Sequence, residues 1–176
     1  MKKKLFSLLI GIFAVILMTG CGAKKIDKEE ITLKDDTLKY KTTFKYEKED
    51  GFEFVQDIDG GRYKEIEFKN TSENLYFDMY YTEQKTETYE ETKKNRKTNK
   101  YYKEYKYGKY DAYVYSDYSD NLYLDIKLSE DSKTKSVKTI YVAIETITYD
   151  NSDVVFDMFN RKVTQDFFNS IELTVE

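Results

Sequence analysis

Apolar and polar residues alternate over most of the chain after Leu38, and the two kinds then occupy opposite faces of an extended backbone. Between Thr139 and Tyr149 both faces are apolar, which predicts a central strand. The strands that these patterns predict cover residues 38–46, 52–58, 63–68, 75–81, 101–107, 110–116, 122–128, 139–149 and 171–175. Tight turns are expected at Gly108-Lys109 and in the glycine-containing segment around Gly60, because glycine reaches positive φ without steric cost.

The pattern changes to a period of four near the C-terminus. Val155, Phe159, Val163 and Phe167 lie four residues apart, which places them on one face of an amphipathic helix. We expect one long helix over residues 151–170, starting at an N-cap asparagine or serine.

A second, weaker helix is predicted over residues 84–95. The segment is rich in charged and polar residues, and Glu90 precedes Lys94 in the i,i+4 order that supports helices. Tyr89 is its only large apolar residue, so its buried face is narrow. The alternatives are a long polar loop and a mobile charged lid.

These elements predict an α+β fold in which a largely antiparallel β-sheet carries the long C-terminal helix on one face. The element order, with the ending Phe168-Asn169-Ser170-Ile171, resembles the PsbP-like α/β/α sandwich over residues 35–176. That family includes photosystem II extrinsic subunits and many small bacterial lipoproteins. The resemblance implies a single sandwich domain over these residues.

The first 21 residues resemble the leader of a bacterial prolipoprotein. Lys2–Lys4 precede an uncharged apolar run, Leu5–Met18, which is too short to span a bilayer comfortably. Met18-Thr19-Gly20-Cys21 then resembles the lipobox of that family. The resemblance implies that residues 1–20 are a signal peptide cleaved between Gly20 and Cys21.

The same resemblance implies that the Cys21 sulfur receives a diacylglyceryl group, whose palmitate-type acyl chains anchor the protein to the extracytoplasmic face of the cell membrane. Two acyl chains are enough for stable anchoring, whereas one holds only marginally. Residues 21–34 would then be a charged tether that carries the domain. The alternative is an ordinary signal peptide with an unrelated cysteine near its end.

Composition excludes several classes of function. The chain from residue 21 onward has 26 basic and 33 acidic residues, a net charge of −7, which argues against a nucleic-acid partner. With one cysteine in the sequence, no disulfide can form within the chain. There is no histidine, the most frequent general base near neutral pH, and no serine lies in a glycine-rich nucleophile turn. We expect no cofactor and no catalytic residue.

The most unusual local feature is a tyrosine-rich segment over residues 101–115. The chain has 18 tyrosines, and many of them lie in this segment. One interpretation is an exposed aromatic platform for a glycan, a peptide or a partner protein. The other is that half of these rings face the core and half line a solvated sheet face. The residues of the possible binding face are Tyr101, Tyr105, Tyr107, Tyr110, Tyr113 and Tyr115.

Two acidic segments are candidates for calcium sites. Asp57-Ile58-Asp59-Gly60 starts like a calcium loop, but the fifth and twelfth positions hold Gly61 and Phe68, so a hairpin turn is favoured and no metal is assigned. The second segment, between Asp117 and Asp125 and including Asp120, is either a calcium ligand set or a solvated loop.

The leading hypothesis is therefore a non-enzymatic, membrane-anchored lipoprotein that binds an unidentified protein or surface ligand through an exposed sheet face. The alternative is a cell-wall hydrolase that uses a pair of carboxylates. A flat, tyrosine-lined sheet face would favour binding, and a cleft with two carboxylates roughly 5–10 Å apart would favour hydrolysis.

Overall fold

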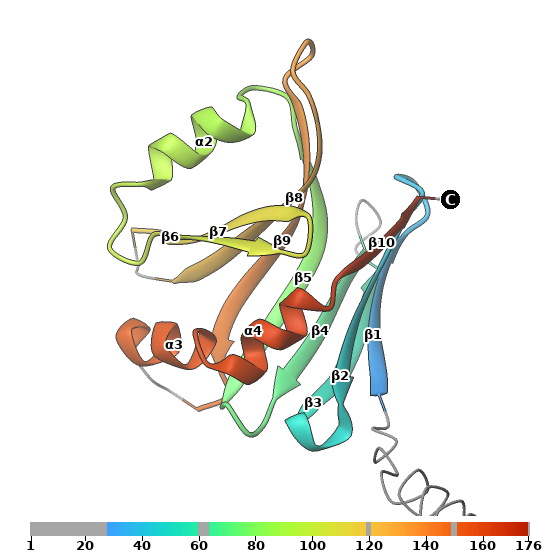
Figure 1. Cartoon of the computed structure of the whole chain (residues 1–176), viewed down its shortest axis with the longest axis vertical. Coiled ribbons are helices and arrows are strands. Elements are labelled where there is room, and N and C mark those ends of the chain that lie inside the picture. The colour runs from blue at the N-terminus through green and yellow to red at the C-terminus, as the bar shows by residue number, and fades with distance from the viewer. Residues whose placement is uncertain (1–27, 60–63, 119–120, 149–150, 176) are drawn as a thin grey trace, which may run out of the picture.

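The computed structural model describes residues 28–59, 64–118, 121–148 and 151–175 (Figure 1). The predicted signal peptide, Gly20, Cys21 and most of the predicted tether lie outside the described residues, as do Gly60 and Asp120. The fold is mostly antiparallel β-sheet, with 55% of the described residues in strands and 20% in helices.

Seven strands form one antiparallel sheet in the order β3-β4-β5-β9-β8-β7-β6, so that β9 lies near its centre as its two apolar faces predicted. The strands are β3 (Phe52–Asp59), β4 (Lys64–Asn70), β5 (Leu75–Gln84), β6 (Lys103–Tyr107), β7 (Tyr110–Ser116), β8 (Leu122–Asp131) and β9 (Ser136–Thr146). Gly108 turns the β6–β7 hairpin with a φ of 57°, as its position in the sequence predicts.

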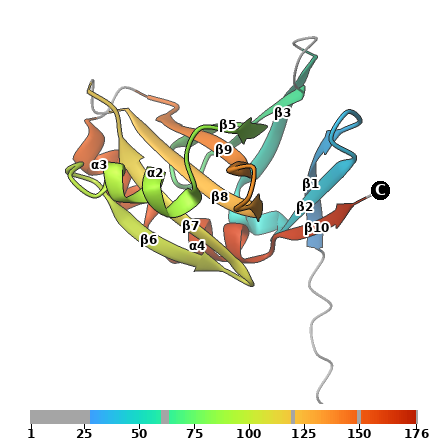
Figure 2. The ribbon, with the colours of Figure 1, turned by 90° about the horizontal axis from the view of Figure 1, so that it is seen from above.

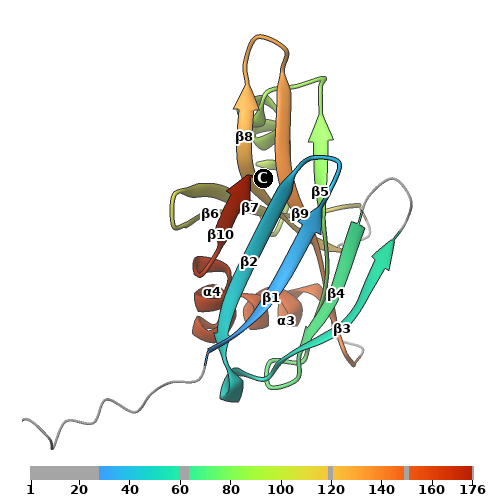
Figure 3. The same cartoon turned by 90° about the vertical axis from the view of Figure 1, so that its right-hand side faces the viewer.

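A second, three-stranded antiparallel sheet packs against the inner face of the first (Figure 3). It contains β1 (Lys28–Asp35), β2 (Tyr40–Glu47) and β10 (Glu172–Val175), and the short 3₁₀-helix η1 (Lys48–Asp50) leads from β2 to β3. β1 lies within the segment expected to be a tether. Its buried apolar side chains, Ile31 and Leu33, are too few to stand out as a strand pattern, and pairing with β2 completes the strand.

The prediction of one long C-terminal helix is wrong. The segment forms two short helices, α3 (Ser152–Phe159) and α4 (Lys162–Asn169), with Asn160 and Arg161 between them. The Asn160 side chain donates to the Phe156 carbonyl at 2.6 Å and accepts from the Tyr105 hydroxyl at 2.7 Å. A side chain that bonds the backbone in this way competes with helix continuation. Both helices bury apolar residues on the side that faces the core, so the period of four continues through both segments. The sequence pattern therefore does not reveal the break between them.

The α/β/α sandwich expected from the PsbP-like resemblance is also wrong. On the inner face of the seven-stranded sheet lie the three-stranded sheet and the two short helices, and the only described helix on the outer face is α2 (Tyr89–Arg96) (Figure 2). The weaker middle helix is therefore present but starts later than predicted, because β5 extends to Gln84 and Thr88 caps the helix. Tyr89 is its one buried residue, as the sequence pattern indicated.

The main core lies between the two sheets and is centred on Phe167 of α4. This ring is 1% exposed and lies 4.1 Å from the ring centre of Phe52, 5.2 Å from that of Phe44 and 5.1 Å from that of Phe68. Since these rings come from both sheets, α4 connects the two layers. Aromatic pairs at such separations add about 0.5–1.5 kcal/mol each beyond burial.

Candidate functional site

The candidate site is the outer face of β4, β5 and β9. Along β5 the side chains alternate between full burial, as at Phe77 and Met79, and half-burial on the outer side, as at Asp78 and Tyr80. The helix α2 covers the β7–β8 side of the outer face and leaves this part open among the described elements. We call this surface the acidic face; it consists of Glu65, Glu67, Tyr76, Asp78, Tyr80, Tyr141 and Glu145.

Three carboxylates meet on the acidic face. Glu67 of β4 lies directly opposite Asp78 of β5, and Glu65 is two residues before Glu67 on the same side of the strand. One carboxylate oxygen from each residue lies within 4.8 Å of the other two. Like charges opposite each other across two strands are destabilising. The sheet therefore holds these groups together against their mutual repulsion.

The effect of this repulsion is clearest at Asp78. Its burial, together with the nearby charges of Glu65, Glu67 and Glu145, raises the pKa of its carboxyl to about 6. Burial and the Glu67 charge also raise the pKa of Glu65. The Oδ1 atom of Asp78 is buried and has no hydrogen-bond partner among the described residues. An oxygen in this position has an unmet preference for a proton or a cation.

The position of Glu67 is fixed by two neighbours. The Tyr76 hydroxyl donates to Oε2 of Glu67 at 2.5 Å, and the Gln56 side-chain amide donates to the same oxygen. None of the ion pairs between described residues involves Glu67, Glu65, Asp78 or Glu145, as far as the structure describes them. The acidic face thus presents ordered negative charge that no described lysine or arginine neutralises.

A row of tyrosine rings continues from the acidic face across the sheet. Tyr80 and Tyr141 have ring centres 4.9 Å apart, Tyr141 and Tyr123 5.3 Å, and Tyr123 and Tyr115 5.6 Å. These residues lie opposite or diagonal to one another on β5, β9, β8 and β7. The row ends at Tyr113, beneath α2.

A second acidic group, Asp125, lies in the covered part of this row. Asp125 keeps some exposed surface, but its carboxyl is enclosed, and burial raises its pKa to about 6. Hydrogen bonds from Tyr113 and Tyr115 and the charge of Arg96 oppose this rise. The Arg96 guanidinium of α2 stacks over the Tyr115 ring at 4.3 Å. Arg96 therefore both helps to hold α2 against the sheet and places a positive charge near Asp125.

In chemical terms, the acidic face is suited to a cationic group. Carboxylate oxygens are the ligands of hard cations, and Glu65, Glu67 and Asp78 are close enough to share one ion. Equally, they can accept hydrogen bonds from a lysine or arginine side chain, while half-exposed tyrosine rings attract cations through their faces. The sequence pattern does not reveal this cluster, because three acidic residues on two strands become neighbours only through the strand register.

The six tyrosines of the expected platform do not form an exposed face. Tyr101, Tyr107, Tyr110, Tyr113 and Tyr115 are each less than a tenth exposed, and only Tyr105 is half-buried. The interpretation that divides these rings between the core and the sheet face describes their directions better, because α2 covers the outward rings of Tyr113 and Tyr115.

The structure does not gather the two acidic segments into a described calcium site. Asp117 accepts hydrogen bonds from the backbone and side chain of Asn121 and from the Tyr123 hydroxyl. Asp125 lies beneath α2 instead. In the other segment, β3 runs through Asp57 to Asp59, so these residues belong to a strand where a turn was expected.

Comparison with protein-family models, with curated proteins and with solved structures found no match for this chain. In the part of the chain that the structure describes, every helix is too short or too polar to cross a lipid bilayer.

Proposed function

We propose that the protein is an extracytoplasmic lipoprotein, anchored to the cell membrane by a diacylglyceryl group on Cys21, that acts as a non-enzymatic binding module. The leader and the lipobox-like Met18-Thr19-Gly20-Cys21 segment support the anchor. The acidic face supports the binding role, because it is an open sheet surface with ordered carboxylates and half-exposed tyrosine rings.

The partner of this surface carries a basic segment. A lysine or arginine that reaches Glu67 and Asp78 gains a charge-assisted hydrogen bond and relieves their repulsion, whereas an acidic partner would increase it. Tyrosines such as Tyr80 and Tyr141 supply contact area with little loss of side-chain entropy. The unneutralised carboxylate cluster is the observation that carries this proposal.

Binding can be tested with the full-length protein in non-ionic detergent and a lysine-rich probe peptide, using fluorescence anisotropy. We expect the double variant Glu65→Gln/Asp78→Asn to weaken binding at least tenfold and to reduce its salt dependence. Glu91→Gln, which changes an exposed carboxylate on α2, is the matched control and should bind like the wild type. Equal binding by all three proteins would refute the role of the acidic face.

The anchor is tested separately. Cys21→Ser should leave an unlipidated precursor that stays in the aqueous phase during detergent phase partitioning, while the wild type enters the detergent phase. Mass spectrometry of the wild-type N-terminal peptide from its native host should show the acyl chains. An unmodified Cys21 there would rule out the anchor without affecting the test of the acidic face.

One observation favours the alternative, a hydrolase that acts on cell-wall material. The pKa of Asp78 is raised to about 6 beside Glu67, as the pKa of the acid is in glycoside hydrolases. The two carboxylates nevertheless have oxygens within 4.8 Å of each other on an open sheet face, whereas hydrolysis calls for a cleft and a separation of roughly 5–10 Å. Incubation of purified cell wall with the wild type and with Asp78→Asn decides between the two functions. Release of reducing ends by the wild type alone would replace the binding proposal.

A further inference from the structure

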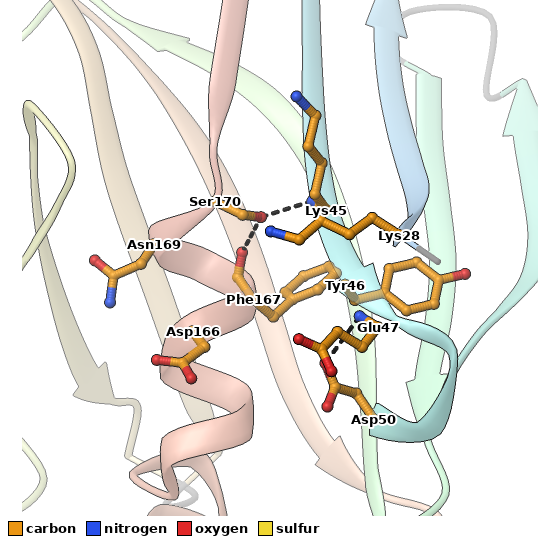
Figure 4. Close-up of a pocket in the computed structure, with 9 residues that line it drawn as sticks. All are labelled: Lys28, Lys45, Tyr46, Glu47, Asp50, Asp166, Phe167, Asn169 and Ser170. Carbon is orange, nitrogen blue, oxygen red and sulfur yellow. Dashed lines mark hydrogen bonds between the residues drawn. The ribbon is translucent and has the colours of Figure 1, made fainter. Parts of the chain in front are cut away.

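A pocket of about 520 Å³ lies where the three-stranded sheet meets the C-terminal end of α4, and its lining shares no residue with the acidic face (Figure 4). The rings of Tyr46 and Phe167 form its apolar part, and both residues are less than a tenth exposed. Pockets for small organic molecules commonly have volumes of about 300–1,000 Å³. The size therefore suits a molecule as large as an amino acid or a short peptide.

The charges that line this pocket are separated by sign. Lys28 and Lys45 extend along its upper side in Figure 4, and the carboxylates of Glu47, Asp50 and Asp166 lie on the lower side. The carboxylates come from β2, η1 and α4, so three different elements bring them together. A ligand with charge of a single sign would meet attraction at one side and repulsion at the other.

Some of these charges have a partner and others do not. Lys45 pairs with Glu172 at 2.5 Å, and Asp166 pairs with Lys162 on the exposed side of α4. Lys28 forms no ion pair with any described residue, and its amino group points into the pocket in Figure 4. Lys28 is therefore the group most available to an anion.

The C-terminal end of α4 lies at the upper side of the pocket, beside Lys28 and Lys45 in Figure 4. The pocket contains the last turn of α4, from Asp166 to Ser170, where backbone carbonyls give the helix a partial negative charge. The Ser170 hydroxyl donates to the Phe167 carbonyl and accepts from the Lys45 backbone N–H, each at 2.6 Å. Since both of its roles are used within the fold, Ser170 shapes the pocket and is not a free nucleophile.

From this geometry we infer that the pocket binds a small zwitterion, a molecule that joins a primary ammonium to a carboxylate or phosphate through a short linker. The anionic group meets Lys28, the ammonium meets the carboxylates of Glu47 and Asp50, and the linker lies between these two sides of the pocket. This inference is independent of the lipid anchor and of the acidic face, because it uses different residues. The same chemistry occurs in amino acids and short peptides and in the headgroup of an ethanolamine phospholipid.

Isothermal titration calorimetry on the full-length protein in non-ionic detergent tests the inference with three probes: glycylglycine, glycerophosphoethanolamine and N-acetylglycinamide, which lacks both charges. We expect one or both zwitterions to bind and the uncharged probe not to bind. Binding of glycylglycine identifies an amino-acid or peptide source, and binding of glycerophosphoethanolamine alone identifies a lipid headgroup.

Two variants tie the binding to the pocket. Lys28→Gln and Glu47→Gln each remove one charge from opposite sides, and each should weaken zwitterion binding about tenfold, the loss expected for one charge-assisted contact. Lys133→Gln, in the exposed β8–β9 turn, is the control and should bind like the wild type. Failure of both zwitterions to bind the wild type, equal binding of N-acetylglycinamide, or unchanged binding in both pocket variants would overturn the inference.

Discussion

Replacing Asp78 by asparagine should make the protein more stable at neutral pH, although the residue is partly buried and polar. The pKa of Asp78 in the folded state, about 6, is higher than that of an unfolded aspartate, near 3.8. At pH 7 the folded protein therefore holds a carboxylate that would be less costly in water. A shift of about two pKa units corresponds to about 3 kcal/mol, which solvent screening of this half-buried group reduces to about 1 kcal/mol.

The sign follows from proton binding. Between about pH 4 and pH 6 the folded state binds a proton at Asp78 and the unfolded state does not, so this group's contribution to stability falls as pH rises through that range. An asparagine does not titrate, and its amide can donate a hydrogen bond to Glu67 directly across the strand pair. The variant should therefore gain about 1 kcal/mol over the wild type at pH 7.5 and nothing at pH 4.

Urea denaturation of both proteins at pH 7.5, 6.0, 5.0 and 4.0 measures this difference. Asp111→Asn is a matched control on the same sheet face, because Asp111 lies near Lys106 and Lys127 and its loss should not stabilise the fold. If Asp78→Asn were less stable than the wild type at pH 7.5, or if the difference did not change with pH, the repulsion argument for the acidic face would be refuted.

Three further substitutions probe the fold. Gly51→Ala should lower the free energy of unfolding by about 2 kcal/mol in urea denaturation, because Gly51 has a φ of 84° and a Cβ there would lie 2.1 Å from the Ser72 hydroxyl oxygen; an unchanged midpoint would contradict this turn geometry. Phe167→Ala should cost about 3–5 kcal/mol in the same assay, since it opens a cavity between the two sheets, and a loss below 1 kcal/mol would show that the ring is not central. Thr88→Ala removes the hydrogen bond that the Thr88 hydroxyl accepts from the Glu91 backbone N–H at the start of α2, and should weaken the helix by about 1 kcal/mol. Amide hydrogen exchange should then accelerate within α2 and not in β9, and uniform acceleration would indicate instead that α2 unfolds only with the whole domain.

Local patterns predicted most of the strands, because alternation reports directly which side of a strand is covered. β5 and β8 illustrate this, with their apolar residues in the core and their polar residues outside. The C-terminal helices show what a periodic pattern of apolar residues leaves out. A period of four describes which face is buried, and α3 and α4 bury a common face, so the pattern gave no sign that Asn160 ends one helix and Arg161 starts the next.

The acidic face depended on register, which alternation does not contain. Glu67 and Asp78 are eleven positions apart in the sequence, and each looks like an ordinary solvated residue of an exposed strand face. Pairing of β4 with β5 places them opposite each other, and pairing of β5 with β9 adds Glu145 nearby. The exposure of the tyrosines depended on packing for a related reason, because residues such as Tyr113 point outward from the sheet but are then covered by α2.

The sequence by itself determined that this chain forms a largely antiparallel β structure without histidine chemistry or disulfides, and it supplied the leader on which the proposed anchor rests. These properties depend on residue type and on neighbours along the chain. Only the tertiary structure decided which side of the sheet stays open, where the carboxylates gather and how the charges of the α4 pocket separate. Such properties arise from strand order and from the packing of elements that are distant in the sequence, and local residue preferences do not specify these contacts.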